Sequence, residues 1–277
     1  MLAFKYTPHR VTFPCFIQPK LNGVRGIYDP RCTPHFQSRY GERWSQSIVQ
    51  HALSPLTKLG NVFLDGEFYR HGMSLQEINS RIAVVRTSPH KEGALIPFNV
   101  FDIIARVSFR DRWKLMHTWL REKFEDVESV NIVETREVFT PQEADYWYNQ
   151  WKNVQGFEGL MYRDADAVYG LSSQCGNKEN RWWHLQKRKE MLDMECEVLG
   201  LNEMVDKDGE RKDTLGSFTF ETSEGIKFTA GSGLTMQQRH EYWHRNEEMI
   251  GTRCRVLYET LSDGGVPLKP IIECVYE

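Results

Sequence analysis

The sequence lacks any apolar run approaching the ~20 residues that a helix needs to span a bilayer. Its first residues also lack the basic segment, apolar segment and small-residue cleavage site of a secretory signal. We therefore expect a cytoplasmic protein, in a bacterium or an infected host cell, that does not associate with a membrane. Hydrophobic residues make up 40% and charged residues 26% of the chain, which is typical of a globular protein and unlike a disordered one.

Cysteine is also sparse, and its six residues are scattered along the chain. No two of them form a CxxC pair, and none lies near histidines at the spacing of a zinc site. The sequence has no internal repeat and no low-complexity tract. We therefore expect reduced thiols rather than a disulfide framework or a structural zinc.

The net charge of −3 does not by itself favour a nucleic-acid partner, but the charge is unevenly distributed. Residues 1–188 carry 25 Lys and Arg against 20 Asp and Glu, which gives +5. Residues 189–277 carry 10 against 18, which gives −8. This change of sign predicts two modules and places a phosphate-binding surface mainly on the first.

The first module mixes strand and helix signals. Apolar segments predict strands at residues 16–20, 24–28, 62–65 and 97–104. An Asn22-Gly23 turn separates the first two strands and predicts a β-hairpin. Capping-box sequences that begin at Ser74 and Thr140 predict two helices. The module is therefore expected to be of the α+β class.

The second module begins after Glu190 and is dominated by short strands. Strands are predicted at residues 195–203, 215–222, 226–230, 253–260 and 271–276. One helix is predicted at residues 236–249, between the third and fourth strands. This order is typical of an OB-fold β-barrel, and an SH3-like barrel has a similar pattern.

Residues 20–26, which read KLNGVRG, form the strongest local motif. A tight Asn-Gly turn exposes the amine of Lys20 and lets the backbone approach a phosphate closely. Arg25 adds a fixed positive charge a few residues later. Taken alone, the segment fits a surface hairpin that carries two solvated charges better than it fits a phosphate site.

Five further motifs follow in the same order as in a known superfamily. They are SRYG at 38–41, LDGEF at 64–68, FNVFDII at 98–104, EGLMYR at 158–163 and KRK at 187–189. Together with residues 20–26, they resemble the motif series of the covalent nucleotidyltransferases. This superfamily comprises ATP-dependent DNA ligases, RNA ligases and mRNA-capping guanylyltransferases.

The resemblance implies a role for each motif residue. The implied catalytic residues are Lys20, Arg25, Arg39, Lys187 and Lys189, with Lys20 as the nucleophile that carries AMP. The implied ATP-binding residues are Gln18, Lys20, Arg25, Glu67, Phe101, Glu158, Lys187 and Lys189. Glu158 and Glu67 are the implied ligands of Mg²⁺, which Mn²⁺ can replace. The expected DNA-binding residues are Asn22, Ser38, Arg39, Lys207, Arg211 and Lys212.

Motifs in the second module favour DNA joining over the other activities of the superfamily. Residues 215–218, 229–234, 250–252 and 258–270 resemble the OB domain of DNA ligases. The resemblance implies an adenylation domain of antiparallel sheets and flanking helices at residues 1–189 and an OB-fold barrel at 190–277. We therefore expect a minimal ligase, of phage, viral or bacterial accessory type, that seals 5′-phosphate/3′-hydroxyl nicks in duplex DNA. An RNA ligase or a GTP-using capping-type enzyme is the alternative, followed by a non-catalytic nucleic-acid-binding relative.

The sequence departs from the family pattern in three places. Asn22 replaces the aspartate that is usual in the nucleophile motif. The resemblance implies that this aspartate serves the nick-dependent steps, so the replacement is expected to affect the rate of sealing and not the adenylation of Lys20. The basic C-terminal motif is missing, and Lys269 is its only candidate substitute. The OB module is acidic, so that DNA affinity is expected to come mainly from the first module or from a partner protein. We expect the chain to be a monomer.

Overall fold

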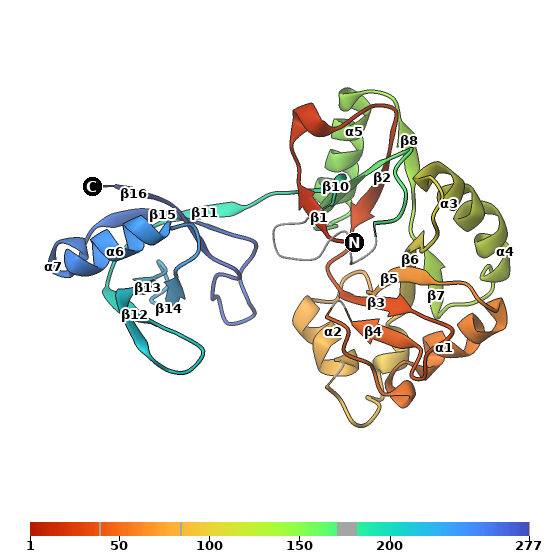
Figure 1. The fold of residues 1–277 in the computed structure, drawn as a ribbon, viewed down its shortest axis with the longest axis horizontal. Coiled ribbons are helices and arrows are strands. Elements are labelled where there is room, and N and C mark those ends of the chain that lie inside the picture. The colour runs from red at the N-terminus through yellow and green to blue at the C-terminus, as the bar shows by residue number, and fades with distance from the viewer. Residues whose placement is uncertain (39, 84, 171–181, 277) are drawn as a thin grey trace. The chain divides into compact units, whose positions relative to one another are not determined.

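The computed structural model describes residues 1–38, 40–83, 85–170 and 182–276. The chain divides into two compact units, residues 1–189 (unit 1) and residues 190–277 (unit 2) (Figure 1). No helix in the described part of the chain has the length and apolar character needed to cross a membrane. Each unit has its own hydrophobic core.

Unit 1 is built on two five-stranded sheets, which we name sheet A and sheet B. The strands of sheet A, in spatial order, are β1 (Ala3–Lys5), β10 (Trp182–Lys189), β9 (Gly159–Asp164), β2 (Cys15–Lys20) and β8 (Arg136–Val138). Those of sheet B are β4 (Phe36–Ser38), β3 (Val24–Tyr28), β5 (Leu64–Phe68), β6 (Phe98–Ile103) and β7 (Val130–Ile132). Neighbouring strands are antiparallel except at the β1–β10 and β6–β7 pairs.

The prediction of a hairpin across Asn22-Gly23 was wrong. β2 pairs with β8 and β9 in sheet A, whereas β3 pairs with β4 and β5 in sheet B. The turn therefore carries the chain from one sheet to the other. The backbone N–H of Gly23 donates to the Glu67 carboxylate at 2.6 Å instead of closing a two-residue turn. This long-range bond directs the chain away from the local pairing that the turn residues favour.

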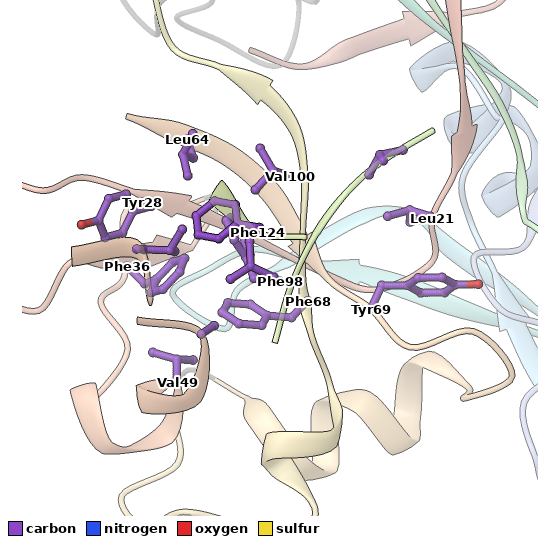
Figure 2. Close-up of a cluster of buried hydrophobic side chains, with 14 of the residues drawn as sticks. Leu21, Tyr28, Phe36, Val49, Leu64, Phe68, Tyr69, Phe98, Val100 and Phe124 are labelled. Atoms are coloured by element: carbon purple, nitrogen blue, oxygen red, sulfur yellow. The ribbon is translucent and has the colours of Figure 1, made fainter. Parts of the chain in front are cut away.

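The helices of unit 1 cover the two sheets. They are α1 (Gln50–Leu56), α2 (Leu75–Ile82), α3 (Phe109–Leu115), α4 (Arg121–Lys123) and α5 (Pro141–Asn149). The predicted capping box at Ser74 is confirmed at the start of α2, and Thr140 caps α5. Phe36, Phe68 and Phe98 pack together in the larger core (Figure 2). A smaller core joins β2 to α5 and includes buried Trp151 from the helical turn Gln150–Val154 that follows α5.

Side chains alternate along β2 and divide its residues between two environments. Cys15 and Ile17 lie in the smaller core with α5. Phe16 belongs to the larger core, and Gln18 and Lys20 follow it at two-residue intervals. Because alternate residues of a strand share a face, Gln18 and Lys20 point to the same side of sheet A as Phe16. β2 thereby presents the two polar residues away from α5.

Unit 2 consists of two three-stranded sheets around one core. One sheet contains β11 (Leu192–Glu197), β15 (Arg253–Tyr258) and β16 (Ile271–Tyr276). The other contains β12 (Gly200–Val205), β13 (Arg211–Glu221) and β14 (Lys227–Ala230). The helices are α6 (Met236–His244) and α7 (Asn246–Met249). α6 lies between β14 and β15 in the chain, as the sequence pattern predicted.

The strand predicted at 195–203 divides into β11 and β12 because the chain changes sheets at residues 198–199. There, Val198 N–H donates to Thr252 while Leu199 N–H donates to Thr219 in the other sheet. A parallel bridge between Ser232 and Ile271 is a second link between the two sheets. In the part of unit 2 that is described, no continuous ladder closes these sheets into a barrel. The arrangement is OB-like, with both sheets packed on Phe218 and Phe220.

Candidate active site

The candidate nucleophile Lys20 ends β2 in direct contact with Glu158. Its Nζ donates to Glu158 Oε2, and the Lys20 carbonyl accepts from the Glu158 N–H at 3.1 Å. These residues are 138 positions apart in the sequence, and the β2–β9 pairing brings them together. Both side chains are less than one-fifth exposed. The charge pair is therefore partly shielded from water, which strengthens it.

A second lysine holds the other oxygen of the same carboxylate. Lys189 Nζ lies 3.3 Å from Glu158 Oε1, at the end of β10. Lys187 is two residues earlier on β10 and opposes Met161 in the ladder. Because residues i and i+2 of a strand share a face, Lys187 and Lys189 project to the same side. The site thus brings Lys20 and Lys189 onto one glutamate, with Lys187 on the same face of β10 as Lys189.

Gly159 lets these strands approach closely enough to form this cluster. It faces Lys20 across β2–β9 and Lys189 across β9–β10. A Cβ at this position would collide with the Arg188 carbonyl oxygen. The glycine of the EGxxx[KR] motif is therefore required by backbone proximity in sheet A.

Glu67, in β5, is the second carboxylate of the site. It accepts the Gly23 N–H at 2.6 Å, and burial raises its pKa to about 7 although Lys20 and that hydrogen bond favour the charged form. Its neighbour Gly66 has no space for a side chain, since an added Cβ would lie 2.6 Å from the Asn99 carbonyl oxygen. The close approach of β5 and β6 therefore holds Glu67 beside the Asn22-Gly23 turn that follows Lys20.

Arg25 is held by a network of unit 1 groups. Its guanidinium donates to both oxygens of Asp65, at 2.9 and 2.6 Å, and to the Met1 carbonyl at 2.6 Å. The Tyr169 hydroxyl donates to Asp65 at 2.7 Å and lies 3.5 Å from Arg25. Burial disfavours the charged guanidinium, but the Asp65 carboxylate outweighs this and raises the pKa of Arg25.

Sequence reasoning missed Asp65 and Tyr169. The sequence identified Asp65 only as part of the LDGEF motif and assigned it no role. An aspartate in a strand of buried residues is nevertheless expected to be paired with a positive charge. Tyr169 lies in no motif, and only the folded chain brings it to Asp65 across 104 residues. Both residues orient the arginine of the nucleophile motif.

Gln18 is fully buried and uses both ends of its amide. Its Nε2 donates to the Phe101 carbonyl at 3.0 Å and to Thr135 Oγ1 at 2.8 Å. Its Oε1 accepts from Arg163 Nε at 2.6 Å. Arg163 and Arg112 in turn share the buried carboxylate of Asp102. The structure therefore places Gln18 in a polar network that the motifs did not identify.

Phe101 lies between two of the site's arginines. The Arg163 guanidinium is 5.3 Å from the ring centroid, and that of Arg25 is 5.9 Å away. These distances fit cation–π contacts. The ring is partly buried against the larger core, so it also packs as a strand aromatic. Phe101, one of the implied ATP-binding residues, thus lies between the Arg25 network and the Gln18 network.

The predicted DNA-binding residues have diverse surroundings. Asn22 is exposed, whereas Ser38 is buried and its Oγ accepts the N–H groups of Tyr40 and Glu42. Arg39 lies outside the described residues. In unit 2, Arg211 pairs with Glu203 and Lys212 with Asp206. Lys207 is exposed in the same hairpin.

The two glutamates have the donor chemistry that Mg²⁺ prefers. Mg²⁺ is a hard cation that commonly takes one or two protein carboxylates and fills its other positions with phosphate oxygens and water. Glu67 and Glu158 can supply that share. In the described ranges, no three His, Cys, Asp or Glu side chains form a ready metal cluster. The residues therefore fit an ion that arrives with a nucleotide rather than a permanently held metal.

Two family models match this chain. Residues 2–186 match the ATP dependent DNA ligase domain family, and residues 208–275 match the DNA ligase OB-like domain family. A search of curated proteins gave no match.

Solved DNA ligases share the fold. A Lig E DNA ligase superposes with a TM-score of 0.77 at 20% identity, covering 100% of this chain and 98% of that one. The structure named Pmar-Lig_Pre gives 0.78 at 20% identity over 99% of this chain and 66% of that one. The Chlorella virus DNA ligase-adenylate gives 0.51 at 21% identity over 99% and 98%.

The fold and site together define a nucleotidyltransferase-like domain followed by an OB-like domain. The chain belongs to the ATP-dependent DNA ligases, since the ligase domain model matches well over half of its length. It is therefore an enzyme that uses ATP and acts on DNA, in the class that seals nicks.

Proposed function

We propose that this ligase seals nicks through AMP carried on Lys20. In the first step, the Lys20 amine attacks the α-phosphorus of ATP and pyrophosphate leaves. AMP then passes from Lys20 to the 5′-phosphate of the nick. Finally, the adjacent 3′-hydroxyl attacks that phosphate, joins the strands and expels AMP. The observation that carries the proposal is the Lys20–Glu158–Lys189 cluster, which unites three separate motifs.

The cluster provides what the first step needs. An ammonium has no lone pair, so Lys20 must lose a proton before or during attack. Glu158, which accepts its N–H, is the group placed to receive or relay that proton. Lys187 and Lys189 supply positive charge for the oxygens of the α-phosphate. Bound Mg²⁺, held by Glu158 and Glu67 or replaced by Mn²⁺, would neutralise phosphate charge and aid pyrophosphate departure.

The remaining residues bind the substrates in this proposal. Glu67 faces the ribose, Phe101 stacks on the base, and Gln18 supports the base pocket through its bond to the Phe101 carbonyl. Arg25, held by Asp65, and Arg39 serve the ribose and the nick phosphate. Residues 1–189 act as the adenylation domain and residues 190–277 as the OB domain, with a hinge at 188–192. Asn22, Ser38, Lys207, Arg211 and Lys212 contact the nicked duplex.

Mass spectrometry after incubation with ATP and Mg²⁺ tests the nucleophile. One added AMP is expected on the wild-type chain and none on Lys20→Ala. Lys58→Ala, which changes an exposed lysine of the same unit, serves as the control and should label normally. Wild-type labelling that persists in Lys20→Ala would refute the assignment.

A sealing assay on nicked duplex DNA tests the later steps. ATP should support sealing, and Lys20→Ala should abolish it. Labelling with GTP alone, or joining of RNA but not DNA, would favour an RNA-end enzyme instead. DNA binding without either labelling or sealing would identify a non-catalytic relative. A native mass of one chain is expected, and added replication or repair partner protein would raise DNA affinity if a partner contributes to binding.

A further inference from the structure

Two histidines of unit 2 face each other on one side of α6. His240 and His244 are one helical turn apart, and such i, i+4 residues are neighbours on a helix surface. Their Nε2 atoms lie 3.1 Å apart and their ring centroids 4.3 Å apart. Both side chains are exposed. Imidazole nitrogens are the commonest side-chain ligands of late transition metals.

Asp213 brings a carboxylate to this pair from another element. It lies in β13 with a positive φ of 45°, a conformation that few non-glycine residues adopt. Its Oδ1 accepts the Trp243 indole N–H at 3.0 Å. Its Oδ2 lies 3.8 Å from His244 Nε2. The strand thus holds an acidic oxygen next to the paired imidazoles.

Both separations measured from His244, to His240 and to Asp213, are short enough for two ligands of one ion. Zinc–nitrogen and zinc–oxygen bonds are about 2.0–2.2 Å long, so two ligands of the same ion lie at most about 4 Å apart. The 3.1 Å and 3.8 Å separations both fall within this limit. The Asp213 side chain is 79% exposed, so solvent leaves it room to turn toward the ion once its hydrogen bond from Trp243 is released. That rotation is needed because no three such ligands in the described chain already converge.

We propose that His240, His244 and Asp213 form a binding site for a zinc-class divalent ion on unit 2. Water fills the fourth position. The ion joins α6 to β13 and so stabilises the OB-like fold. This site does not use any residue of the proposed adenylation chemistry. Its test can therefore fail without affecting the proposed function, and the reverse also holds.

Calorimetric titration of ZnCl₂ into the full chain tests the site. Millimolar Mg²⁺ is kept present to compete with Zn²⁺ at carboxylates elsewhere on the chain. One equivalent should bind to the wild-type chain, and His240→Ala and His244→Ala should each remove this binding. Asp213→Asn should weaken it at least about 10-fold. His9→Ala, which removes an exposed histidine of unit 1, is the matched control and should bind normally.

Absorption of bound Co²⁺ and the imidazole NMR signals of the wild-type chain provide a second measurement that does not depend on the variants. Tetrahedral Co²⁺ bands and shifted signals from two histidines would support the site. Absence of binding, or binding unchanged in His240→Ala, would overturn the proposal. Unchanged affinity in Asp213→Asn would overturn the three-ligand site, since a plain histidine pair then accounts for binding.

Discussion

The charged residues of unit 1 occur as shared networks rather than simple pairs. Glu158 is shared by Lys20 and Lys189, and Asp102 is shared by Arg163 and Arg112. Each carboxylate lies where low exposure makes an unpaired charge costly. A substitution at one such residue therefore changes the charge balance of several partners.

Glu67 should make stability depend on pH. Burial raises its pKa from 4.5 to about 7, so protonation of the folded state is favoured. Its stabilising contribution is complete below about pH 4.5 and is lost as pH rises through about 7. Glu67→Gln removes this dependence because glutamine stays neutral.

Urea unfolding at pH 5.5 and pH 8.0 measures the effect. The free energy of unfolding of Glu67→Gln, relative to wild type, should rise by about 2 kcal/mol from the lower to the higher pH. All other groups should affect both proteins equally, so the difference between the two proteins isolates Glu67. A difference that does not change with pH would show that Glu67 titrates normally.

Asp65→Asn should both destabilise the chain and slow adenylation. It leaves the guanidinium of Arg25 without its carboxylate, and breaking a buried ion pair from one side costs about 3 kcal/mol or more. Asp145→Asn is the matched control, because the Arg188–Asp145 pair lies at the surface with Asp145 55% exposed. That change should cost less than about 1 kcal/mol. Thermal unfolding and AMP labelling rates check both expectations, and equal losses would contradict them.

At the scale of elements, the β2–β9–β10 ladder builds the site. β9 lies between the strand that carries Lys20 and the strand that carries Lys189. Glu158 immediately precedes β9, where both neighbours reach it. The register of three strands, and not one loop, sets the positions of the lysines.

Gly159→Ala should disturb this ladder. The added methyl group would collide with the Arg188 carbonyl oxygen and force β10 away from β9. We expect a stability loss of about 1–3 kcal/mol and an adenylation rate at least about 10-fold lower, because Lys189 would move from Glu158. Gly93→Ala is the control, since its nearest neighbour atom would be 3.5 Å away. Single-turnover labelling with AMP measures the adenylation rate of both variants. A normal rate for Gly159→Ala would contradict the role of the β2–β9–β10 ladder.

At the scale of the whole molecule, charge divides unevenly between the two units. Residues 1–188 carry +5 and residues 189–277 carry −8. DNA affinity depends on phosphate contacts made by Lys and Arg. Within unit 2, Arg211 and Lys212 of the 207–212 hairpin already pair with acidic residues. The balance of affinity is therefore expected to lie with unit 1.

The salt dependence of DNA binding tests the contribution of this hairpin. Replacing Lys207, Arg211 and Lys212 together by alanine should make the negative slope of log K against log salt shallower. The magnitude of the slope should fall by about 0.9 for each DNA phosphate that is no longer neutralised, up to about 3 in total. Lys227→Ala, another exposed lysine of unit 2, is the control and should leave the slope unchanged. Fluorescence anisotropy with nicked DNA measures both. An unaltered slope in the triple variant would exclude the hairpin from the DNA surface.

Much of this protein was predictable because its informative features are local. The motif letters and their order indicated a ligase, and the family comparison confirmed it. The Ser74 capping box and the order of elements in unit 2 were also predicted, since helix starts and strand periodicity depend on neighbouring residues. The hairpin at Asn22-Gly23 was mispredicted because a turn preference cannot identify the sheets that its flanking strands join.

The sequence alone determined the chemical inventory: a lysine in a nucleophile motif, two glutamates, a basic strand and a strand-rich second module. The tertiary structure decided which of these groups meet. It joined Lys20 to Glu158 across 138 residues, fixed Arg25 on Asp65 and engaged both ends of Gln18. The physical reason is that such contacts depend on sheet register and close backbone approach, which are set by the packing of the whole unit.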